Sequence, residues 1–549
     1  MIEGLHPLVR DILIKRGYEK PEEVDAFLNP NYDKQLHDPF LMKGMQAAVD
    51  RILIAVEKKQ SIVIYGDYDI DGITATTVMV ETIKNLGHEA RSYIPDRFEE
   101  GYGINHDALE KLKSENVDLV ITVDCGITSA KEVAWAMQNG LDIIVTDHHS
   151  VPAVVPEAIA VINPKQSDCE YPFKDLAGVG VAFKLAQALQ QASGKPEKGH
   201  EKWLLDVVAL GTVCDVVTLV GENRVLATFG LKVLNRTRRV GIRALAEVSG
   251  VEMGQITSYT LGFMFGPRMN AAGRLEHAER SVELMLTNDG VRAKTIASEL
   301  DSLNKQRQAD QATIVKEAKE MAAEYADDPI VVLASPDWSH GIVGIAASKV
   351  AESVGKPTLI MQIMDDKAKG SARSFGGFNL IDALRTADDL FIKYGGHAFA
   401  AGYTIPADRL DELRDRLNEH FLDVVADLPE KTVDTDVSLD DFTQIDWGLH
   451  SSLTQLEPFG NGNRQPSIAI GSVDITDMRW VGSDKRHAKL TLSDGKNRLS
   501  GIGFGLADKH PGLVEGQKVS IVAHIDKNDF NGNSSLQLVV RDIDMTTAE

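Results

Sequence analysis

A series of short apolar runs, each separated from the next by a helix-like stretch, constrains the fold of this chain most. The runs are rich in Val and Ile and lack polar alternation, which is typical of strands buried on both faces of a sheet. Strands that alternate with helices predict a parallel, doubly wound α/β sheet. The runs are SIVIY at 61–65, EARSYI at 89–94, VDLVITV at 117–123, LDIIVT at 141–146 and AIAVI at 158–162.

The remainder of the chain predicts three further parts. Residues 291–326 contain neither Gly nor Pro and few apolar positions, which predicts one long polar connecting helix. A smaller α/β unit follows it, and the C-terminal part shows the short alternating runs of an all-β barrel. We therefore expect an α/β domain with a helical N-terminal extension at 1–290, a second α/β domain at 327–428 and a barrel at 429–549.

Composition excludes several classes of protein. The 549 residues are 43% hydrophobic and 25% charged, which excludes a disordered or collagen-like chain. No apolar run reaches the length of about 18 residues that a membrane span requires. Three widely spaced cysteines predict neither a disulfide framework nor a zinc site. With no signal-peptide pattern at the N-terminus, we expect a cytoplasmic protein without a membrane span, and a monomer by default.

The net charge of −23 argues against a general DNA coat, because non-specific affinity comes from neutralising phosphates. A chain this acidic can handle nucleic acid only through metal ions or local basic patches. Two basic segments stand out, at 235–243 and at 479–490, and the second contains Trp480. A basic groove with an aromatic side chain is typical of oligonucleotide-binding barrels. A strand edge protected by lysines is the alternative interpretation.

Potential metal ligands directly follow three of the predicted strands. They are Asp67, Asp69 and Asp71 after the first strand, Asp124 after the third, and Asp147, His148 and His149 after the fourth. The carboxyl ends of parallel strands share one sheet edge, so these separate segments converge. Crowded carboxylates coexist when a cation neutralises them, and oxygen and imidazole ligands without thiolate suit Mn²⁺ or Mg²⁺. One such loop alone is unremarkable, but three at one edge predict two divalent metal ions arranged for attack on phosphorus.

Several longer motifs occur in a fixed order along the chain. They are YGDYDIDG (65–72), TVDCGI (122–127), TDHH (146–149), ALGTVCDVV (209–217), GPRMNAAGR (266–274), WSHGIVGIAASK (338–349), GSARS (370–374), GGHAFAAG (395–402) and EPFGNGNRQP (457–466). In these motifs the chain resembles the DHH phosphoesterase superfamily over essentially its whole length. Within that superfamily it is similar to the bacterial exonucleases that digest single-stranded DNA from the 5′ end.

The resemblance implies a DHH domain, a DHHA1-like domain and an OB-fold-like domain, and it assigns residues to roles. The implied metal ligands are Asp69, Asp71, Asp124, His148 and Asp215, although the spacing around Asp215 fits a helix cap equally well. The implied catalytic residues are Asp67 and His149. The implied substrate contacts are Arg97, Arg268, Asn270 and Arg274, and, on a second domain facing the first across a cleft, Ser371, Arg373, Gly396 and His397. Some members of the superfamily carry His at the position of Tyr65, so the resemblance does not define the complete ligand set of one metal ion.

The resemblance implies a metal-dependent 5′→3′ exonuclease that hydrolyses single-stranded DNA to nucleoside 5′-monophosphates in repair and recombination, with a single-strand-binding protein as a plausible partner. One alternative is a DHH phosphoesterase of small substrates such as pyrophosphate, a bisphosphate nucleotide or an oligoribonucleotide. Another is a noncatalytic DNA-binding scaffold. A dinucleotide site is not expected, because LAGVGVAF at 176–183 has Phe183 where that fingerprint needs Gly or Ala.

Overall fold

The computed structural model describes residues 5–97, 100–101, 103–428, 433–482, 484–530 and 532–545. These residues form two units. The first comprises Met1–Gly273, His277–Leu300 and Asp434–Glu549, and the second comprises Arg274–Glu276 and Asp301–Val433. The domain boundary expected at residue 428 adjoins residues 429–432, which lie outside the described residues.

A five-stranded parallel sheet forms the centre of the first unit, as the apolar runs predict. Its strand order is β2-β1-β3-β4-β5, and every neighbouring pair is parallel. The strands are β1 (Ile62–Gly66), β2 (Ala90–Tyr93), β3 (Leu119–Val123), β4 (Asp142–Thr146) and β5 (Ala160–Ile162). All residues of β1 and β3 are buried, which explains why these runs show no polar alternation.

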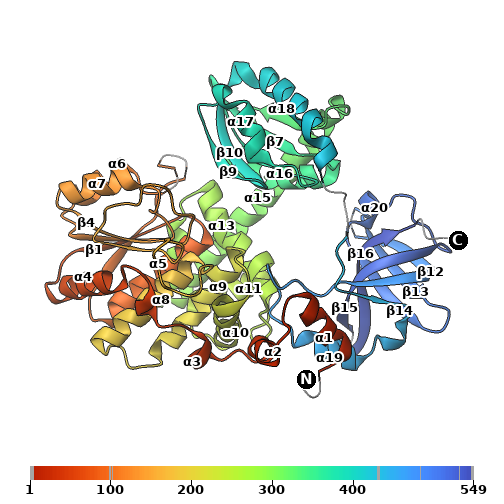
Figure 1. Ribbon diagram of the computed structural model, residues 1–549, viewed down its shortest axis with the longest axis horizontal. Coiled ribbons are helices and arrows are strands. Elements are labelled where there is room, and N and C mark those ends of the chain that lie inside the picture. The colour runs from red at the N-terminus through yellow and green to blue at the C-terminus, as the bar shows by residue number, and fades with distance from the viewer. Residues whose placement is uncertain are drawn as a thin grey trace. The chain divides into compact units, whose positions relative to one another are not determined.

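Helices cover both faces of this sheet (Figure 1). On one face, the apolar residues of β3 and β4 pack with α6 (His106–Ser114) and α7 (Ala130–Gln138). On the other face, they pack with α4 (Met45–Glu57), α5 (Ile70–Asn85) and α8 (Gly178–Ser193). Because the two faces are closed, polar side chains gather where the strands end.

The part after residue 200 is mostly helical, as the sequence predicts. Its helices are α9 (Leu205–Cys214), α10 (Gly221–Leu234), α11 (Val240–Ser249), α12 (Ser258–Thr260), the π-helix η3 (Leu261–Phe265), α13 (Gly266–Leu275) and α14 (Glu279–Leu286). The expected connecting helix is α15 (Gly290–Glu324), 35 residues long. Its sparse apolar positions Ile296, Leu300 and Ile314 are buried.

The second unit contains a mixed five-stranded sheet of order β6-β7-β8-β10-β9. Only the β6–β7 pair, which is joined through α16, is parallel. The pairs β7–β8 and β9–β10 are joined by short turns and are antiparallel, and β10 is also antiparallel to β8. Its strands are β6 (Val331–Ser335), β7 (Thr358–Met364), β8 (Lys367–Arg373), β9 (Lys393–His397) and β10 (Ala400–Pro406), and its helices are α16 (His340–Val354), α17 (Leu380–Thr386) and α18 (Leu410–Val424).

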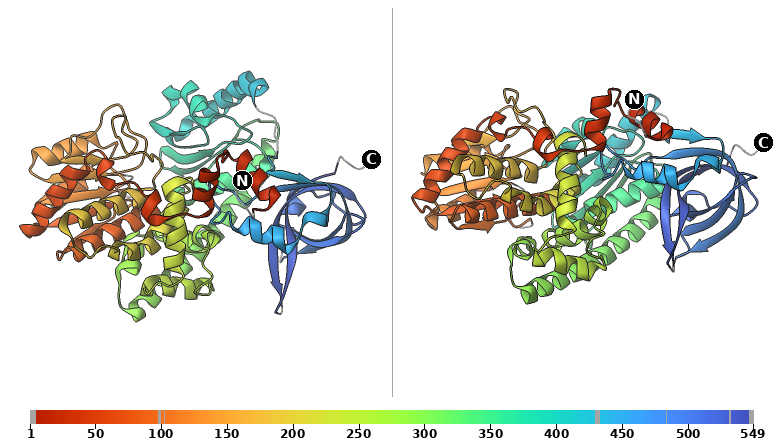
Figure 2. Two further views of the ribbon diagram at one scale, coloured as in Figure 1. Left: turned by 60° about the horizontal axis from the view of Figure 1, so that its bottom comes forward. Right: turned by 90° about the horizontal axis from the view of Figure 1, so that it is seen from below.

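The C-terminal part is the expected barrel. Its strands are β11 (Val437–Leu439), β12 (Ile468–Val481), β13 (His487–Ser493), β14 (Arg498–Gly503), β15 (Lys518–Phe530) and β16 (Asn533–Asp544), with α19 (Trp447–Thr454) and α20 (Leu506–Lys509). The pairing of β12 with β15 closes the sheet into a barrel, which Figure 2 shows from two sides.

The first two N-terminal helices, α1 (Pro7–Lys15) and α2 (Pro21–Leu28), pack on this barrel rather than on the parallel sheet. Tyr32 of the short α3 (Tyr32–Gln35) belongs instead to the apolar core around the parallel sheet. Val9, Ile12 and Leu13 of α1 belong to the same apolar core as the barrel strands. Arg16 fixes this arrangement through an ion pair with Asp436, 2.9 Å away. The barrel core is therefore built from both ends of the chain.

The basic segment at 235–243 is partly structural. Arg239 precedes α11 and is almost buried between α5 and α9, where its guanidinium pairs with Glu81 at 2.5 Å and with Asp206 at 3.2 Å. Burial alone would lower the pKa of Arg239, but the charges of Asp206 and Glu81 outweigh burial and raise it. The guanidinium of Arg239 is therefore paired within the protein and is not part of a DNA-binding patch.

We predict that Arg239→Met lowers the free energy of unfolding by about 3–5 kcal/mol, because it leaves the buried carboxylate of Asp206 without its cation. Urea denaturation followed by circular dichroism measures this change. Arg243→Met is the matched control: Arg243 is exposed on α11, and its loss should cost about 0.5 kcal/mol or less. Equal losses in the two variants would contradict the structural role of Arg239.

Candidate metal centre

The ends of β1 and β3 and the start of α5 place the first acidic side chains at one sheet edge. Asp67 directly follows β1 and is 3% exposed. Asp69 is the N-cap of α5, and its carboxylate accepts the N–H groups of Asp71 at 2.9 Å and Gly72 at 3.2 Å. Asp124 follows β3 with a φ of 60°, a left-handed conformation that is uncommon outside glycine. Such backbone strain is typical of functional sites.

The start of α8 holds Asp71 in place. The two carboxylate oxygens of Asp71 accept the N–H groups of Gly178 at 2.6 Å and Val179 at 2.8 Å. A Cβ on Gly178 would lie 2.5 Å from Oδ1 of Asp124, so only glycine lets α8 approach this closely. Gly178 of LAGVGVAF therefore allows α8 to pack against the acidic cluster, a role that the sequence pattern does not reveal.

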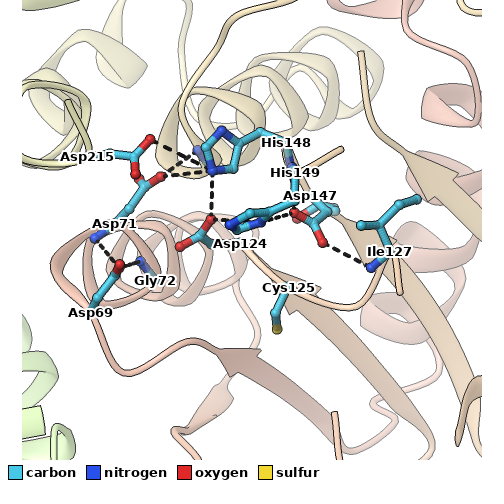
Figure 3. Close-up of polar contacts among 12 residues, drawn as sticks. Asp69, Asp71, Gly72, Asp124, Cys125, Ile127, Asp147, His148, His149 and Asp215 are labelled. Carbon is cyan, nitrogen blue, oxygen red and sulfur yellow. Dashed lines mark hydrogen bonds and ion pairs between the residues drawn. The ribbon is translucent and has the colours of Figure 1, made fainter. Parts of the chain in front are cut away.

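His148 faces the carboxylates with an unprotonated nitrogen. Its Nδ1 lies 3.0 Å from the carbonyl oxygen of Leu176, which can only accept, so Nδ1 carries the proton and Nε2 a lone pair. Nε2 lies 3.2 Å from Oδ1 of Asp124, 3.7 Å from Oδ2 of Asp215 and 3.9 Å from Oδ2 of Asp71. Figure 3 shows the imidazole directed at these three carboxylates.

Asp215 reaches the site from a different direction. It caps the C-terminus of α9, and its side chain is 20% exposed. A Cβ on Gly211, one turn earlier, would lie 2.2 Å from Oγ1 of Thr74 and 3.1 Å from Oδ1 of Asp71. Glycine at this position allows α9 to pack tightly on α5 and brings Asp215 to the cluster.

The donor set fits a divalent metal. Within the described residues, four buried acceptor atoms of the cluster lack a hydrogen-bond donor: Oδ1 of Asp67, Oδ1 of Asp124, Oδ2 of Asp215 and Nε2 of His148. Three ligand groups have all their donor atoms within 4.8 Å of one another: Asp67, Asp69 and Asp124; Asp71, His148 and Asp215; and Asp124, His148 and His149. Buried acceptors that face one another are stable only around a cation or a proton.

The pKa values of the metal-free groups reflect the same crowding. Burial, followed by repulsion from Asp69, raises the pKa of Asp71 to about 7. Burial, followed by repulsion from Asp71, raises that of Asp215 to about 9. Burial and neighbouring carboxylates also raise the pKa of Asp67 and of Asp124. Burial, with the charge of His149, lowers the pKa of His148 to about 4 and keeps it neutral.

Asp147 orients His149 and is not available as a metal ligand. One of its oxygens accepts hydrogen bonds from the backbone N–H groups of His148 at 2.7 Å and of His149 at 3.0 Å. The same oxygen accepts a hydrogen bond from the ring Nδ1 of His149 at 2.7 Å. The other accepts the N–H of Ile127 at 2.9 Å. Burial alone would lower the pKa of His149, but the hydrogen bond and charge of Asp147 outweigh burial and raise it. The sequence pattern places Asp147 only among the potential metal ligands and does not reveal that it orients His149.

The predicted substrate contacts of the first unit lie beside the cluster. The guanidinium of Arg97 lies over the ring of Tyr68, 4.9 Å from its centroid, and its charge partly opposes the rise in the pKa of Asp67 that burial causes. On α13, a Cβ on Gly273 would lie 2.6 Å from the carbonyl oxygen of Tyr68, so this helix packs on the Asp67–Asp71 loop. Oδ1 of Asn270 is buried, and no described residue offers it a hydrogen bond. Arg268 donates to the carbonyl of Met264 at 2.8 Å.

The remaining predicted contacts lie in the second unit. A Cβ on Gly344 of α16 would lie 3.1 Å from Oγ of Ser371 and 3.2 Å from a guanidinium nitrogen of Arg373, so these two polar groups converge. Across the sheet, Ala400 pairs with both Arg373 and His397. Gly396 is next to His397 on β9, and Arg274 donates to the carbonyl of Gly341 at 3.1 Å.

The basic segment of the barrel is only partly available. Arg486 is engaged by Asp508, and Trp480 packs against the barrel core with part of its surface exposed. Arg479 is exposed on β12, with Asp477 at 3.7 Å. Residue 483 of this segment lies outside the described residues.

Comparison with known proteins agrees with this architecture. Residues 61–212 match the DHH family N-terminal domain, 327–423 the DHHA1 domain and 433–542 the RecJ OB domain. The single-stranded-DNA-specific exonuclease RecJ of Dickeya dadantii is 36% identical over 98% of this chain and 96% of its own length. The RecJ of Bacillus subtilis is 40% identical over 99% of this chain and 69% of its own. The chain belongs to the RecJ family.

Solved RecJ structures share the fold. The crystal structure of Thermus thermophilus RecJ in complex with Mn²⁺ superposes with a TM-score of 0.83 at 28% identity, covering 98% of this chain and 76% of that one. A second structure of the same protein contains Mg²⁺, with a TM-score of 0.78. The RecJ-family fold expected from the sequence is therefore confirmed. Within the described residues, no helix has the length and hydropathy needed to cross a membrane.

We predict that the metal-free protein becomes less stable as the pH rises from 5.5 to 8.5. The folded pKa values of Asp71 and Asp215 lie above the ordinary value of about 3.9, so the folded state binds more protons than the unfolded state in this window, and raising the pH removes them at a cost. Urea denaturation in a chelator should show a loss on the order of 1 kcal/mol or more.

Asp215→Asn should flatten this pH dependence, because the amide cannot ionise. Saturating Mn²⁺ should reverse it, since binding requires the deprotonated ligands. A metal-free wild-type protein whose stability rises with pH would contradict the proposed crowding.

Proposed function

We propose that this chain is a metal-dependent exonuclease that hydrolyses single-stranded DNA from the 5′ end and releases nucleoside 5′-monophosphates. The observation that carries the proposal is the cluster of buried, unpartnered acceptors on Asp67, Asp124, His148 and Asp215. Membership of the RecJ family supplies the substrate class, because its curated members are named single-stranded-DNA-specific exonucleases.

Asp69, Asp71, Asp124, His148 and Asp215 would hold two divalent ions, Mn²⁺ or Mg²⁺. Such ions neutralise phosphate charge and lower the pKa of water at the site. Asp67 faces Asp69 and Asp124 closely enough to share in this shell. The N–H groups of Gly178 and Val179 fix the carboxylate of Asp71, so the ligands are oriented before any metal binds.

His149 would act on the phosphate. Its Nδ1 is committed to Asp147, so the reacting nitrogen is Nε2, and the side chain is 44% exposed at the site. The raised pKa of His149 favours the protonated ring, which donates to a phosphate oxygen and stabilises the charge that develops there. Asp147 would keep the ring in this orientation.

Cationic and amide side chains would bind the DNA. Arg97 and Asn270 lie beside the acidic loop, and Arg268 and Arg274 belong to the same helix as Asn270. Ser371 and Arg373, with Gly396 and His397, would receive a terminal 5′ phosphate, because serine and arginine both donate to phosphate oxygens. An end-binding site of this kind would account for the 5′→3′ direction.

The wider setting is also part of the proposal. We place the enzyme in the cytoplasm, as a monomer acting in DNA repair and recombination, with a single-strand-binding protein as a partner. The intact cluster argues against a noncatalytic scaffold. The barrel argues against a small-substrate phosphoesterase, because pyrophosphate or a dinucleotide needs no oligonucleotide-binding domain.

We predict that the purified protein with Mn²⁺ releases labelled mononucleotide at once from single-stranded DNA labelled at its 5′ end, and only late from DNA labelled at its 3′ end. Duplex DNA should be spared. Asp124→Ala, which removes a carboxylate that belongs to two ligand groups, should abolish release while circular dichroism shows a retained fold. Hydrolysis of pyrophosphate or dinucleotides without DNA cleavage would instead assign the chain to the small-substrate class.

We predict that Asp147→Asn lowers kcat about a hundredfold while leaving Mn²⁺ affinity nearly unchanged. Both oxygens of Asp147 are occupied by protein donors, so the substitution disturbs His149 and not the ligand shell. Steady-state kinetics and calorimetric Mn²⁺ titration separate the two effects. A loss of metal binding equal to that of Asp124→Ala would show that Asp147 is a ligand.

A further inference from the structure

The motif EPFGNGNRQP lies far from the acidic cluster in sequence but contacts the segment that carries Asp215. The motif connects α19 to β12. Its centre is a tight turn in which the N–H of Gly460 donates to the carbonyl of Asn463 at 2.9 Å, and the N–H of Asn463 donates back at 3.2 Å. Gly462 has a φ of 71°, which favours glycine at this position. The turn therefore presents Asn461 at its tip.

This turn docks on the residues that directly follow Asp215. The side-chain amide of Asn461 donates to the carbonyl of Val216 at 2.8 Å, and the N–H of Leu219 donates to the carbonyl of Asn461 at 2.7 Å. A Cβ on Gly460 would lie 2.6 Å from Cδ1 of Leu219, and one on Gly462 would lie 3.0 Å from Cβ of Thr218. The two glycines thus permit an approach that side chains would prevent.

Val216 adopts a conformation that its own residue type disfavours. Its φ is 63°, in the left-handed region, where a β-branched residue is a genuine outlier. The side chain is 63% exposed, so packing does not hold the backbone in this state. Within the described residues, the hydrogen bond from Asn461 is the contact that fixes the Val216 carbonyl. Strain of this kind persists only where surrounding contacts determine it.

The motif is anchored independently of this contact. Arg224 of α10 donates to the carbonyls of Leu456 at 3.0 Å and Glu457 at 2.9 Å. Oγ of Ser258 donates to the carbonyl of Phe459 at 2.7 Å, and the side-chain amide of Asn463 donates to that of Leu456 at 2.7 Å. Removing the Asn461 side chain would therefore leave the turn in place.

We propose that Asn461 is a positioning residue of the metal centre. By holding Val216 in the left-handed conformation, it ends α9 at Asp215 and sets that carboxylate 3.7 Å from Nε2 of His148. The inference rests on the proposed metal site and adds a contribution from the segment that leads into the barrel. None of the residues implied as ligands or substrate contacts belongs to this motif.

The first test is a calorimetric titration with Mn²⁺ in the absence of DNA. Asn461→Ala should weaken Mn²⁺ binding about fivefold, the effect of losing one hydrogen bond. In DNA hydrolysis, the variant should need more Mn²⁺ for half-maximal rate and recover at high Mn²⁺, with an unchanged KM for DNA. Asn139→Ala is the matched control, because Asn139 is exposed and donates one 2.8 Å bond to the carbonyl of Trp135 before β4, away from the strand ends.

The second test is rescue at Val216. Glycine adopts a φ near 63° without penalty, so Val216→Gly added to Asn461→Ala should restore most of the lost Mn²⁺ affinity. Because Val216 is exposed, the substitution removes little packing. A merely structural role for Asn461 would instead lower the thermal stability of the metal-free protein, and neither Mn²⁺ nor Val216→Gly would repair it.

The outcomes separate the two proposals. If wild-type protein fails to bind Mn²⁺, the metal site itself is wrong. If wild-type protein binds Mn²⁺ and Asn461→Ala binds it equally well, Asn461 is not a positioning residue. If Asn461→Ala binds weakly and Val216→Gly gives no rescue, the contact does not act through the Val216 backbone, and the inference is overturned.

Discussion

The repulsion among carboxylates buried at one edge of the parallel sheet is the constraint on which the rest of the structure depends. Asp67, Asp71 and Asp124 are each at most 3% exposed. Burial and mutual repulsion raise the pKa of each of them, so the metal-free site is tolerated by holding protons. A bound cation would remove this cost by neutralising the carboxylates. The acidic side chains are therefore already close together in the metal-free protein. The free energy of unfolding is expected to depend on whether metal is bound.

The surrounding fold keeps this crowded cluster in place with backbone groups rather than with opposing charges. Asp71 takes two N–H groups from the start of α8, and Asp147 takes N–H groups from its own loop and from Ile127. An arginine in these places would neutralise the carboxylates and compete with the metal. Backbone donors orient an oxygen and leave its charge available. Glycines at 178 and 211 permit the close approach of α8 and α9.

The sequence best predicted the site residues whose positions follow from the ends of the parallel strands. Parallel strands end at one edge, so Asp69 and Asp124 could be brought together from local patterns alone. Asp215 could be assigned only through resemblance, because it caps a helix whose docking depends on distant contacts. Local spacing likewise does not show that Asp147 of the DHH motif orients His149. The pairing of Arg239 with Asp206 and Glu81 was hidden for the same reason: long-range partners leave no periodic signal.

An acidic protein can act on DNA, a polyanion, when it attracts the DNA only at the end that reacts. With a net charge of −23, long-range attraction to phosphates is absent, and several basic side chains, Arg239 and Arg486 among them, are paired within the fold. In the proposed function, DNA binding then falls to metal ions and to a few short-range donors such as Arg97. Such binding loses less with added salt than a broad basic surface does, because fewer counterions are released. Binding limited to these groups would hold only DNA that reaches the cluster, which agrees with the proposed action at a 5′ terminus.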